Sequence, residues 1–424
     1  MEKLIIQGGN RLEGRVRVSS AKNAVLPIIA GTLLASTPSK LLEIPNLEDV
    51  GTICQVIESL GVKITRNNAD GEIVFDASTL TATEAPYELV RKMRASFLVM
   101  GPLLARKGEA KISMPGGCAI GARPIDLHLK AFEALGAKIE ITEDYVYAHA
   151  PEGLKGTQIY LDFPSVGATE NVIMAASMAE GKTVIENAAE EPEIVDLATF
   201  LNAMGANIRG AGTNVIRIEG VKKLHGAEYS VIPDQIEAGT FMMAAAATRG
   251  DITVKNVIPK HLDCLSSKLR EIGCEVSEFD DAVRVVCKER LHATSVNTLP
   301  YPGFPTDMQP QMSVVLALAR GTSVVTESIF DNRFRYVDEL IRMGANIHVD
   351  GAIAVVEGVR ELNGAPVRAH DLRAGAAMIV AALMAEGTAR VRNIYYIDRG
   401  YEKLEHKLRA LGADIKRIEE PDEE

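Results

Sequence analysis

The strongest constraint on the fold of this chain is a short phrase that occurs six times along it. The phrase reads as a large apolar residue, a glycine, a small or apolar residue and the start of a strand pattern, as in EALGAKI and NAMGANI. Its glycines are Gly61, Gly136, Gly205, Gly273, Gly344 and Gly412, at intervals of 68 to 75 residues. Common solenoid repeats are about 20–50 residues long, so the units of this chain are longer than those repeats. Each unit is therefore long enough to hold a small fold of its own.

The repeated phrases predict the same local structure in each unit. A glycine directly after an apolar helical pattern is typical of a left-handed helix C-cap, so a helix should end there and a strand should follow. A second shared phrase appears as AASMAEGKTVIEN, AAAATRGDITVKN, LALARGTSVVTES and ALMAEGTARVRN. It predicts an alanine-rich helix that stops at a glycine before a strand. Helices that are apolar on most faces are buried.

Six units favour two similar domains of three units each. The fold class is α/β, built from α+β repeats, and each domain should pack three units around buried helices with the sheets outside. A boundary after three units falls near residues 225–235, and the segment before the first helix is expected to close the second domain. The predicted domains are residues 22–231, and residues 1–21 together with 232–424.

Composition and charge exclude several classes of protein. A net charge of −11 leaves no broad basic face for nonspecific binding of nucleic acid. The N-terminus lacks a secretion signal and no apolar run reaches membrane-spanning length, so we expect a cytoplasmic protein without membrane insertion. The five cysteines show no CxxC spacing, which indicates neither a disulfide framework nor a zinc site. No metal-ligand cluster and no obligate protein partner is evident.

Cys118 lies in the segment with the strongest chemical signal. Glycines and prolines crowd residues 115–124 around it, so its neighbours cannot form a packed core. Lys111 and Arg123 bring positive charge, which lowers a thiol pKa toward the thiolate. Cys118 is therefore a candidate proton donor or nucleophile. Most free cysteines are instead small buried hydrophobes, an interpretation that suits Cys54, Cys264, Cys274 and Cys287.

Two helix starts carry a positive charge where the helix dipole disfavours one. Lys22, with Asn23, lies in the first turn of a helix for which Ser19 or Ser20 could be the N-cap. A bound anion and an ordinary solvated lysine are both open interpretations. Arg123 precedes another helix, and an arginine there is unfavourable unless an anion joins it.

Other helix starts combine ordinary capping with possible ligand binding. Pro124 and Asp126 are normal helix-opening residues. Ser165 is a predicted N-cap, and Gly167 would permit close approach of a ligand to the backbone. Asp307 follows a proline-rich loop and could be a general base. Simple N-capping is the alternative for Asp307, and physical reasoning alone favours it.

Three arginines lie beside turns in different units of the repeat. They are Arg94, Arg333 and Arg399, and each could hold a phosphate or a carboxylate. A single arginine is usually a solvated surface residue. Arginines at several such places are harder to explain in that way.

The motifs taken together resemble a known family over essentially the whole chain. They are SAKNA, MRAS, PGGCAIGARPIDLH, SVGAT, EPEIVD, PTDMQPQ, NRF and YIDRGYE, in this order. The chain resembles the UDP-N-acetylglucosamine 1-carboxyvinyltransferases, a family of enolpyruvyl transferases. The resemblance implies two inside-out α/β barrels of three units each, with a substrate cleft between them.

The resemblance also implies a reaction. The enolpyruvyl group of phosphoenolpyruvate would pass to the 3-hydroxyl of UDP-N-acetylglucosamine with release of phosphate, the first committed step of peptidoglycan synthesis, and no cofactor would be needed. One alternative is an enolpyruvyl transferase with another acceptor, such as shikimate 3-phosphate. A second alternative is a noncatalytic scaffold on the same fold.

The resemblance assigns roles to residues of this sequence. Cys118 would be the general acid, open to alkylation by the epoxide fosfomycin, and Asp307 the base. Lys22, Arg123 and Arg399 would surround phosphoenolpyruvate. Phe163-Pro164 departs from the pattern, because some members carry a lysine there that contacts the nucleotide. The other expected substrate-binding residues are Asn23, Arg94, Arg123, Pro124, Ile125, Asp126, Leu127, Ser165, Val166, Gly167, Asp307, Ile329, Arg333, Asp371 and Arg373.

Overall fold

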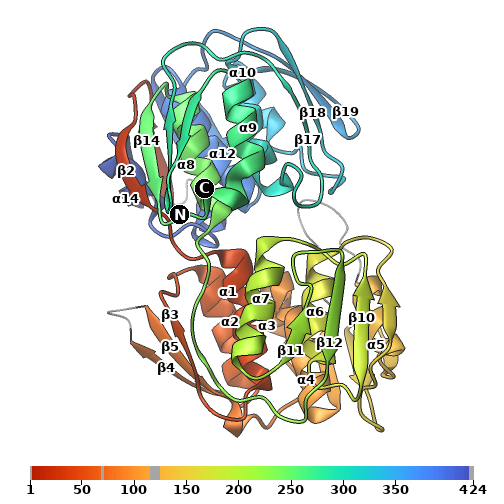
Figure 1. Ribbon diagram of the computed structural model, residues 1–424. Coiled ribbons are helices and arrows are strands. Elements are labelled where there is room, and N and C mark those ends of the chain that lie inside the picture. The colour runs from red at the N-terminus through yellow and green to blue at the C-terminus, as the bar shows by residue number, and fades with distance from the viewer. Residues whose placement is uncertain (1, 68–70, 115–124, 420–424) are drawn as a thin grey trace. The chain divides into compact units, whose positions relative to one another are not determined.

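The computed structural model describes residues 2–67, 71–114 and 125–419, which form two compact units (Figure 1). One unit contains the described residues of Ser20–Cys118 and Arg123–Ile232, and the other contains those of Met1–Ser19 and Pro233–Glu424. Each unit has its own buried apolar core. We refer to them as the central unit and the terminal unit, because the second includes both ends of the described chain.

The central unit contains three sheets and seven α-helices among its described residues. Its buried helices are α1 (Lys22–Gly31), α4 (Met100–Lys107) and α6 (Val166–Ala176), and the others are α2 (Glu48–Ser59), α3 (Tyr87–Lys92), α5 (Asp126–Ala134) and α7 (Pro192–Ala203). The strands of its first sheet are, in spatial order, β13 (Glu228–Ser230), β3 (Ser39–Leu42), β5 (Glu72–Asp76) and β4 (Lys63–Asn67). The second sheet contains β6 (Glu109–Ser113), β8 (Tyr145–His149) and β7 (Lys138–Ile141). The third sheet contains β9 (Gln158–Tyr160), β10 (Lys182–Glu186), β12 (Val215–Glu219) and β11 (Asn207–Arg209).

The terminal unit repeats this organisation. Its buried helices are α8 (Gln235–Ala247), α10 (Gln309–Ala317) and α12 (Leu372–Met384), and the others are α9 (Asp263–Glu271), α11 (Val337–Arg342), α13 (Tyr395–Asp398) and α14 (Leu404–Ala410). The strands of its first sheet are, in spatial order, β2 (Glu13–Arg17), β14 (Asp251–Lys255), β16 (Ala282–Val286) and β15 (Glu275–Glu278). The second sheet contains β17 (Ser295–Asn297), β18 (Thr322–Thr326), β20 (Ile353–Glu357) and β19 (Asn346–Asp350). The third sheet contains β21 (Pro366–Arg368), β22 (Thr388–Arg392), β1 (Glu2–Gln7) and β23 (Asp414–Glu419).

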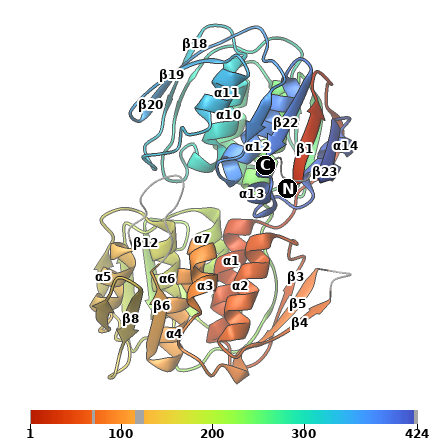
Figure 2. The same ribbon diagram turned by 180° about the vertical axis from the view of Figure 1, so that it is seen from behind.

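The sheets share one pattern of pairing. In each four-stranded sheet an edge strand pairs in parallel with its neighbour and the other pairs are antiparallel. Among the described residues, the three-stranded sheet has one parallel bridge, between Glu84 and Lys111. The first two strands of the chain complete sheets of the terminal unit. Strand β1 lies between β22 and β23 (Figure 2), and β2 pairs with β14 (Figure 1).

The six repeat glycines all end a helix in the left-handed conformation, as predicted. Their φ angles lie between 95° and 110°. In the third copy, the Gly205 N–H donates to the Asn202 carbonyl at 3.0 Å and the Ala206 N–H donates to the Leu201 carbonyl at 3.0 Å. The same pair of bonds recurs in the other five copies. These bonds satisfy helix carbonyls that would otherwise lack a partner.

Two glycine-to-alanine substitutions in the central unit should have opposite effects on its stability. Gly136 has φ +96° and open space where a Cβ would lie, so Gly136→Ala should lower the free energy of unfolding by about 1–2 kcal/mol through backbone strain alone. Gly51 lies inside α2, also with open space, and Gly51→Ala should raise that free energy by up to about 1 kcal/mol. Urea unfolding of both variants tests this. Equal changes in the free energy of unfolding of the two variants would show that alanine can adopt the left-handed conformation of Gly136 without strain.

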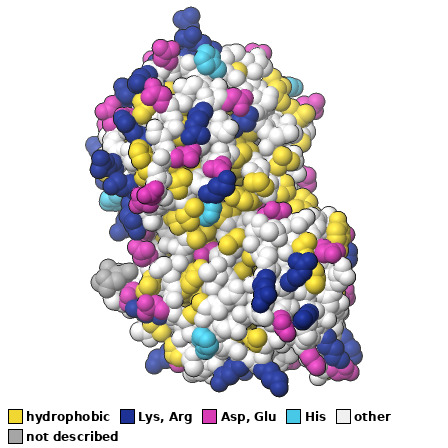
Figure 3. Space-filling model, viewed as in Figure 1, with side chains coloured by type: hydrophobic (Ala, Val, Ile, Leu, Met, Phe, Trp, Pro, Cys, Tyr) yellow, Lys and Arg dark blue, Asp and Glu magenta, His cyan; other side chains and the backbone are white. Residues whose placement is uncertain are grey.

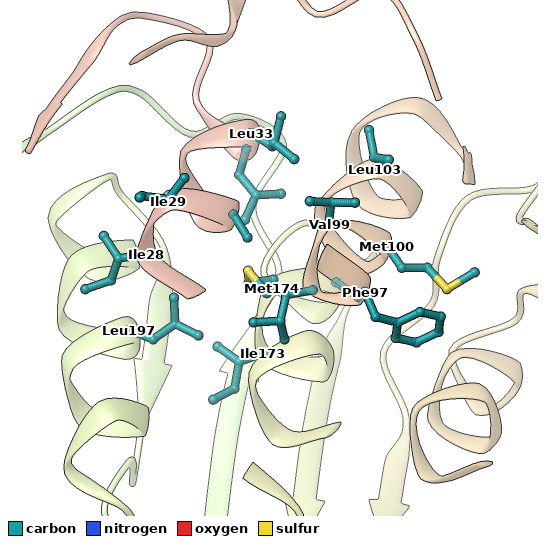
Figure 4. Packing of buried hydrophobic residues seen from close by; sticks show 14 of the residues in the cluster. Ile28, Ile29, Leu33, Phe97, Val99, Met100, Leu103, Ile173, Met174 and Leu197 are labelled. Carbon is teal, nitrogen blue, oxygen red and sulfur yellow. The ribbon is translucent and has the colours of Figure 1, made fainter. Parts of the chain in front are cut away.

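The alanine-rich helices are buried, as predicted from their composition. Every residue of α10 is buried, and so is all of α8 after its first residue. In the central unit, side chains of α1, α4, α6 and α7 meet in one cluster that includes Ile29, Met100 and Met174 (Figure 4). The predicted inside-out arrangement, with helices inside and sheets outside, is confirmed. Among the described residues, no helix is both long and apolar enough to cross a membrane.

Candidate functional site

The buried helices of the terminal unit begin beside three aspartates. Asp234 caps α8 by accepting from the backbone N–H groups of residues 236 and 237, and Asp371 caps α12 by accepting from those of residues 373 and 374. Asp307 lies in a short 3₁₀ turn, Thr306–Met308, directly before α10. Helix α10 has no side-chain cap. The N-capping interpretation of Asp307, which physical reasoning alone favoured, is therefore wrong.

The Asp307 carboxylate is instead paired with two arginines. Arg333 Nη2 lies 3.0 Å from its Oδ1, and Arg373 contacts its Oδ2 through Nε at 3.1 Å and Nη2 at 3.0 Å. The side chains of Arg333 and Arg373 are 2% and 4% exposed, whereas that of Asp307 is 24% exposed. The two guanidinium groups are thus buried behind a carboxylate that reaches solvent.

Both arginines retain buried donors without a protein acceptor. Arg333 Nε and Arg373 Nη1 have none among the residues that the structure covers. The Arg373 guanidinium lies 5.6 Å from the ring centre of Tyr401, whose hydroxyl is held by Thr240 at 2.9 Å. Buried polar groups are nearly always hydrogen-bonded. Two donor groups beside Asp307 therefore remain for a partner other than the described residues, such as a ligand oxygen.

Ile329 lies in a turn that a buried glutamate holds. Glu327 Oε1 accepts from the N–H of Ile329 at 2.9 Å and from that of Phe330 at 3.2 Å. Thr298 and Thr306 donate to the same carboxylate, so the turn is tied to the loop that carries Asp307. Nothing in the sequence singled out Glu327. Glu327 joins the turn to the loop through Thr298 and Thr306, which are distant from it in sequence, so a local sequence pattern does not show this role.

Arg399 is the C-cap residue of α13 in the terminal unit and is half-buried. The residue before it, Asp398, is ion-paired with Arg417 at 2.7 Å. This pair fixes the end of the short helix that carries Arg399.

In the central unit, Lys22 forms a buried ion pair. It is the first residue of α1, and its Nζ lies 2.8 Å from Asp49 Oδ2 at the start of α2. The two side chains are 13% and 4% exposed. The interpretation of Lys22 as a solvated lysine is therefore wrong. Asn23 follows in the same turn and is half-buried.

The predicted N-cap of α1 is also wrong. The cap position is Ala21, without a side-chain bond. Ser20 donates instead to the Glu43 carbonyl at 3.0 Å, and Ser19 Oγ donates to Glu402 at 3.0 Å. Both serines are therefore occupied elsewhere, and the positive charge of Lys22 at this helix start is balanced by Asp49.

Helix α6 begins as predicted, and its first turn contacts a histidine that the sequence did not indicate. Ser165 Oγ accepts from the Ala168 N–H at 3.3 Å. A Cβ at Gly167 would lie 3.3 Å from the His128 ring, so the glycine admits the imidazole. His128 belongs to α5, directly after the predicted residues Ile125, Asp126 and Leu127.

The tautomer of His128 follows from its neighbours. Asn171 Oδ1 accepts from the Gly101 N–H at 2.9 Å, and Asn171 Nδ2 donates to the Phe97 carbonyl at 3.2 Å. Asn171 Nδ2 therefore donates to His128 Nδ1 at 3.0 Å, which places the ring proton on Nε2. Burial, with a contribution from the charge of Arg94, lowers the pKa of His128 to about 3. The imidazole is neutral at physiological pH.

This neutral histidine should make stability depend on pH. The pKa of His128 is about 3 in the folded protein, whereas a histidine in the unfolded chain has a pKa of about 6.5. Below pH 6.5 the unfolded chain binds a proton that the folded chain excludes, so the free energy of unfolding falls as pH falls toward 3. Relative to His128→Gln, the wild type should lose about 1.3 kcal/mol between pH 7 and pH 5.5. Urea unfolding at both pH values tests this, and a constant difference would contradict a buried neutral imidazole.

The structure thus places the predicted residues in separate groups. The central unit holds Lys22 with Asn23, and it also holds the group formed by Arg94, Ile125–Leu127 and Ser165–Gly167 around His128. The terminal unit holds Asp307 with Arg333 and Arg373. Cys118, Arg123 and Pro124 lie outside the described residues. Cys54, Cys274 and Cys287 are buried as predicted, whereas Cys264 is only half-buried.

Comparison with known proteins gives a consistent result. Residues 6–408 match the family model described as EPSP synthase (3-phosphoshikimate 1-carboxyvinyltransferase). UDP-N-acetylglucosamine 1-carboxyvinyltransferase 2 of Carboxydothermus hydrogenoformans is 60% identical over 99% of this chain and 100% of its own length. A Staphylococcus aureus protein named UDP-N-acetylglucosamine 1-carboxyvinyltransferase 1 is 55% identical over 99% and 100%. The crystal structure of the enolpyruvyl transferase NikO from Streptomyces tendae matches with a TM-score of 0.89 at 26% identity, covering 99% of each chain.

Proposed function

Because the chain belongs to the EPSP synthase family of enolpyruvyl transferases, we propose that it transfers the enolpyruvyl group of phosphoenolpyruvate to the 3-hydroxyl of UDP-N-acetylglucosamine and releases phosphate. The family membership predicted from the motifs is confirmed. One observation carries the choice of acceptor: relatives with this activity in their names are 54–60% identical over nearly their full lengths. A solved EPSP synthase of Acinetobacter baumannii is only 20% identical, and this similarity indicates a common fold alone.

The first chemical step is an addition. The Cys118 thiol gives its proton to C3 of phosphoenolpyruvate, which turns the methylene into a methyl group and leaves positive character at C2. The sugar 3-hydroxyl oxygen bonds to C2, and Asp307 takes the hydroxyl proton. In support of this role, the Asp307 carboxylate reaches solvent and is held in place by two buried arginines.

The second step is an elimination. The methyl group of the tetrahedral adduct returns a proton to the Cys118 thiolate, the C2–C3 double bond re-forms, and the bond between C2 and the phosphate oxygen breaks. Phosphate leaves with the electron pair of that bond, and the proton on Asp307 passes to the departing phosphate or to solvent, which restores the carboxylate. The product is an enolpyruvyl ether of the UDP-sugar. Lys22, Arg123 and Arg399 would stabilise the phosphate and carboxylate charges through both steps.

The remaining residues are proposed to bind the UDP-sugar. They are Asn23, Arg94, Pro124, Ile125, Asp126, Leu127, Ser165, Val166, Gly167, Ile329, Arg333, Asp371 and Arg373. Two features of the structure support this proposal. The Ser165–Gly167 turn offers helix N–H groups, which bind anions well. Arg333 and Arg373 have buried donors that lack a protein acceptor.

A comparison of acceptors tests the proposed function. Phosphate release from phosphoenolpyruvate should require UDP-N-acetylglucosamine and should not occur with shikimate 3-phosphate. Release with shikimate 3-phosphate alone would overturn the choice of acceptor. Release with neither acceptor would favour a noncatalytic protein on the same fold.

A further inference from the structure

A cavity lies in the terminal unit, away from Asp307. Its volume is about 740 Å³, and it is lined by Arg249, Glu289, Arg290, Arg320 and Arg360. Arg249 and Arg320 follow the C-terminal ends of α8 and α10, whereas Asp307 precedes the N-terminal end of α10. The nine residues of α10 span about 13 Å. The cavity is therefore separate from the site around Asp307.

The charge in this cavity is unbalanced. Four guanidinium groups and one carboxylate line it, in a chain whose net charge is −11. On the face shown in Figure 3, Lys and Arg side chains are interspersed with Asp and Glu. Other arginines of the terminal unit form ion pairs, such as Arg284 with Asp251 at 2.6 Å. Within the described part of the chain, none of the four cavity arginines is paired with a carboxylate.

One of the four arginines is fixed in place by the backbone. Arg290 donates through Nε to the Leu318 carbonyl at 2.9 Å, and through Nη2 to three further carbonyls, of Ala319, Gly358 and Val359, at 2.8–3.2 Å. These bonds use the carbonyls beyond α10 and β20. They leave Nη1 without an acceptor among the described residues. Arg290 is thus a rigid positive charge in the lining.

The repeat itself does not require arginine at these positions. Arg249 and Arg320 stand directly before the glycine of the second shared phrase, where two other copies carry Glu180 and Glu386. An arginine near a helix C-terminus is favoured by the helix dipole, which could explain these two alone. It does not explain Arg360, which follows strand β20. A ligand would explain why all four line one cavity.

We propose that this cavity binds a small ligand that carries two or more phosphate groups. Guanidinium groups bind phosphate oxygens in pairs of parallel hydrogen bonds. The volume falls within the about 300–1,000 Å³ typical of small-molecule sites. The excess of three positive charges matches a ligand with several negative charges better than it matches a single carboxylate or orthophosphate.

Calorimetric titration with inorganic pyrophosphate tests the proposal. The wild type should bind pyrophosphate, and the R320Q/R360Q double variant should bind it at least ten-fold more weakly. Neither side chain makes a hydrogen bond or an ion pair among the described residues, so the variant should unfold in urea like the wild type and turn over substrates normally. The matched control is R209Q/R217Q, because these two exposed arginines are neighbours across β11 and β12 of the central unit. Its affinity should equal that of the wild type.

Four results would overturn the proposal. The first is a double variant with wild-type affinity, and the second is a wild type that does not bind pyrophosphate. The third is a control variant that weakens binding as much as the double variant, which would indicate a general effect of surface charge. Orthophosphate should bind at least ten-fold more weakly than pyrophosphate. Equal affinity for both would overturn the requirement for two phosphate groups.

Discussion

Replacing Cys118 with alanine should lower kcat by about 10²–10⁴-fold while the chain still folds. A positioned general acid typically contributes this factor, and alanine has no proton to give to C3 of phosphoenolpyruvate. The measurement is steady-state phosphate release together with urea unfolding. The matched control is Cys264→Ala, which removes a half-buried thiol of the terminal unit and should leave turnover unchanged.

A second substitution at Cys118 separates the role of its acidity from that of its sulfur. Cys118→Asp keeps an ionisable proton donor but replaces the nucleophilic sulfur. This variant should retain part of the activity and should resist inactivation by the epoxide fosfomycin. Wild-type turnover in Cys118→Ala would remove the thiol from the mechanism. Inactivation of Cys118→Asp at the wild-type rate would show that the epoxide reacts elsewhere.

Replacing Asp307 should reduce both activity and stability. Asp307→Ala removes the proposed base and should lower kcat by about 10²–10⁴-fold. It also leaves the guanidinium groups of Arg333 and Arg373 buried without a counter-charge, which should lower the free energy of unfolding by roughly 3 kcal/mol. Steady-state kinetics and urea unfolding measure the two effects.

The control for Asp307 is an ion pair with similar contacts but greater exposure. Asp251 also binds an arginine through both oxygens, but the side chain of Arg284 is 48% exposed. Asp251→Ala should cost at most about 1 kcal/mol and leave turnover unchanged. If Asp307→Ala kept full activity, Asp307 would not be the base. If its stability loss matched that of Asp251→Ala, the two arginines would not depend on Asp307.

The architecture could be predicted because its signals are local and repeated. A left-handed glycine after an apolar helix acts through backbone bonds within six residues, and six copies of the signal reinforce one another. The alanine-rich helices likewise show their burial in their own composition. Both features depend on neighbours in sequence, so the sequence displays them.

The errors and omissions share a different cause, which is contact between residues far apart in sequence. Ser19 and Ser20 fit an N-cap locally, but Glu402 and Glu43 hold them. Asp307 also fits a cap locally, yet Arg373, which lies 66 residues away, binds it. The partners of Lys22 and His128, namely Asp49 and Asn171, gave no signal because only the folded chain brings each pair together.

The most direct test of the central claim is the identity and stoichiometry of the products. The purified protein is incubated with phosphoenolpyruvate and UDP-N-acetylglucosamine, phosphate is quantified by ³¹P NMR, and the nucleotide sugar is analysed by mass spectrometry. We predict one enolpyruvyl ether of the UDP-sugar for each phosphate released. Phosphate release with an unmodified UDP-sugar, or no release at all, would contradict an enolpyruvyl transfer to this acceptor.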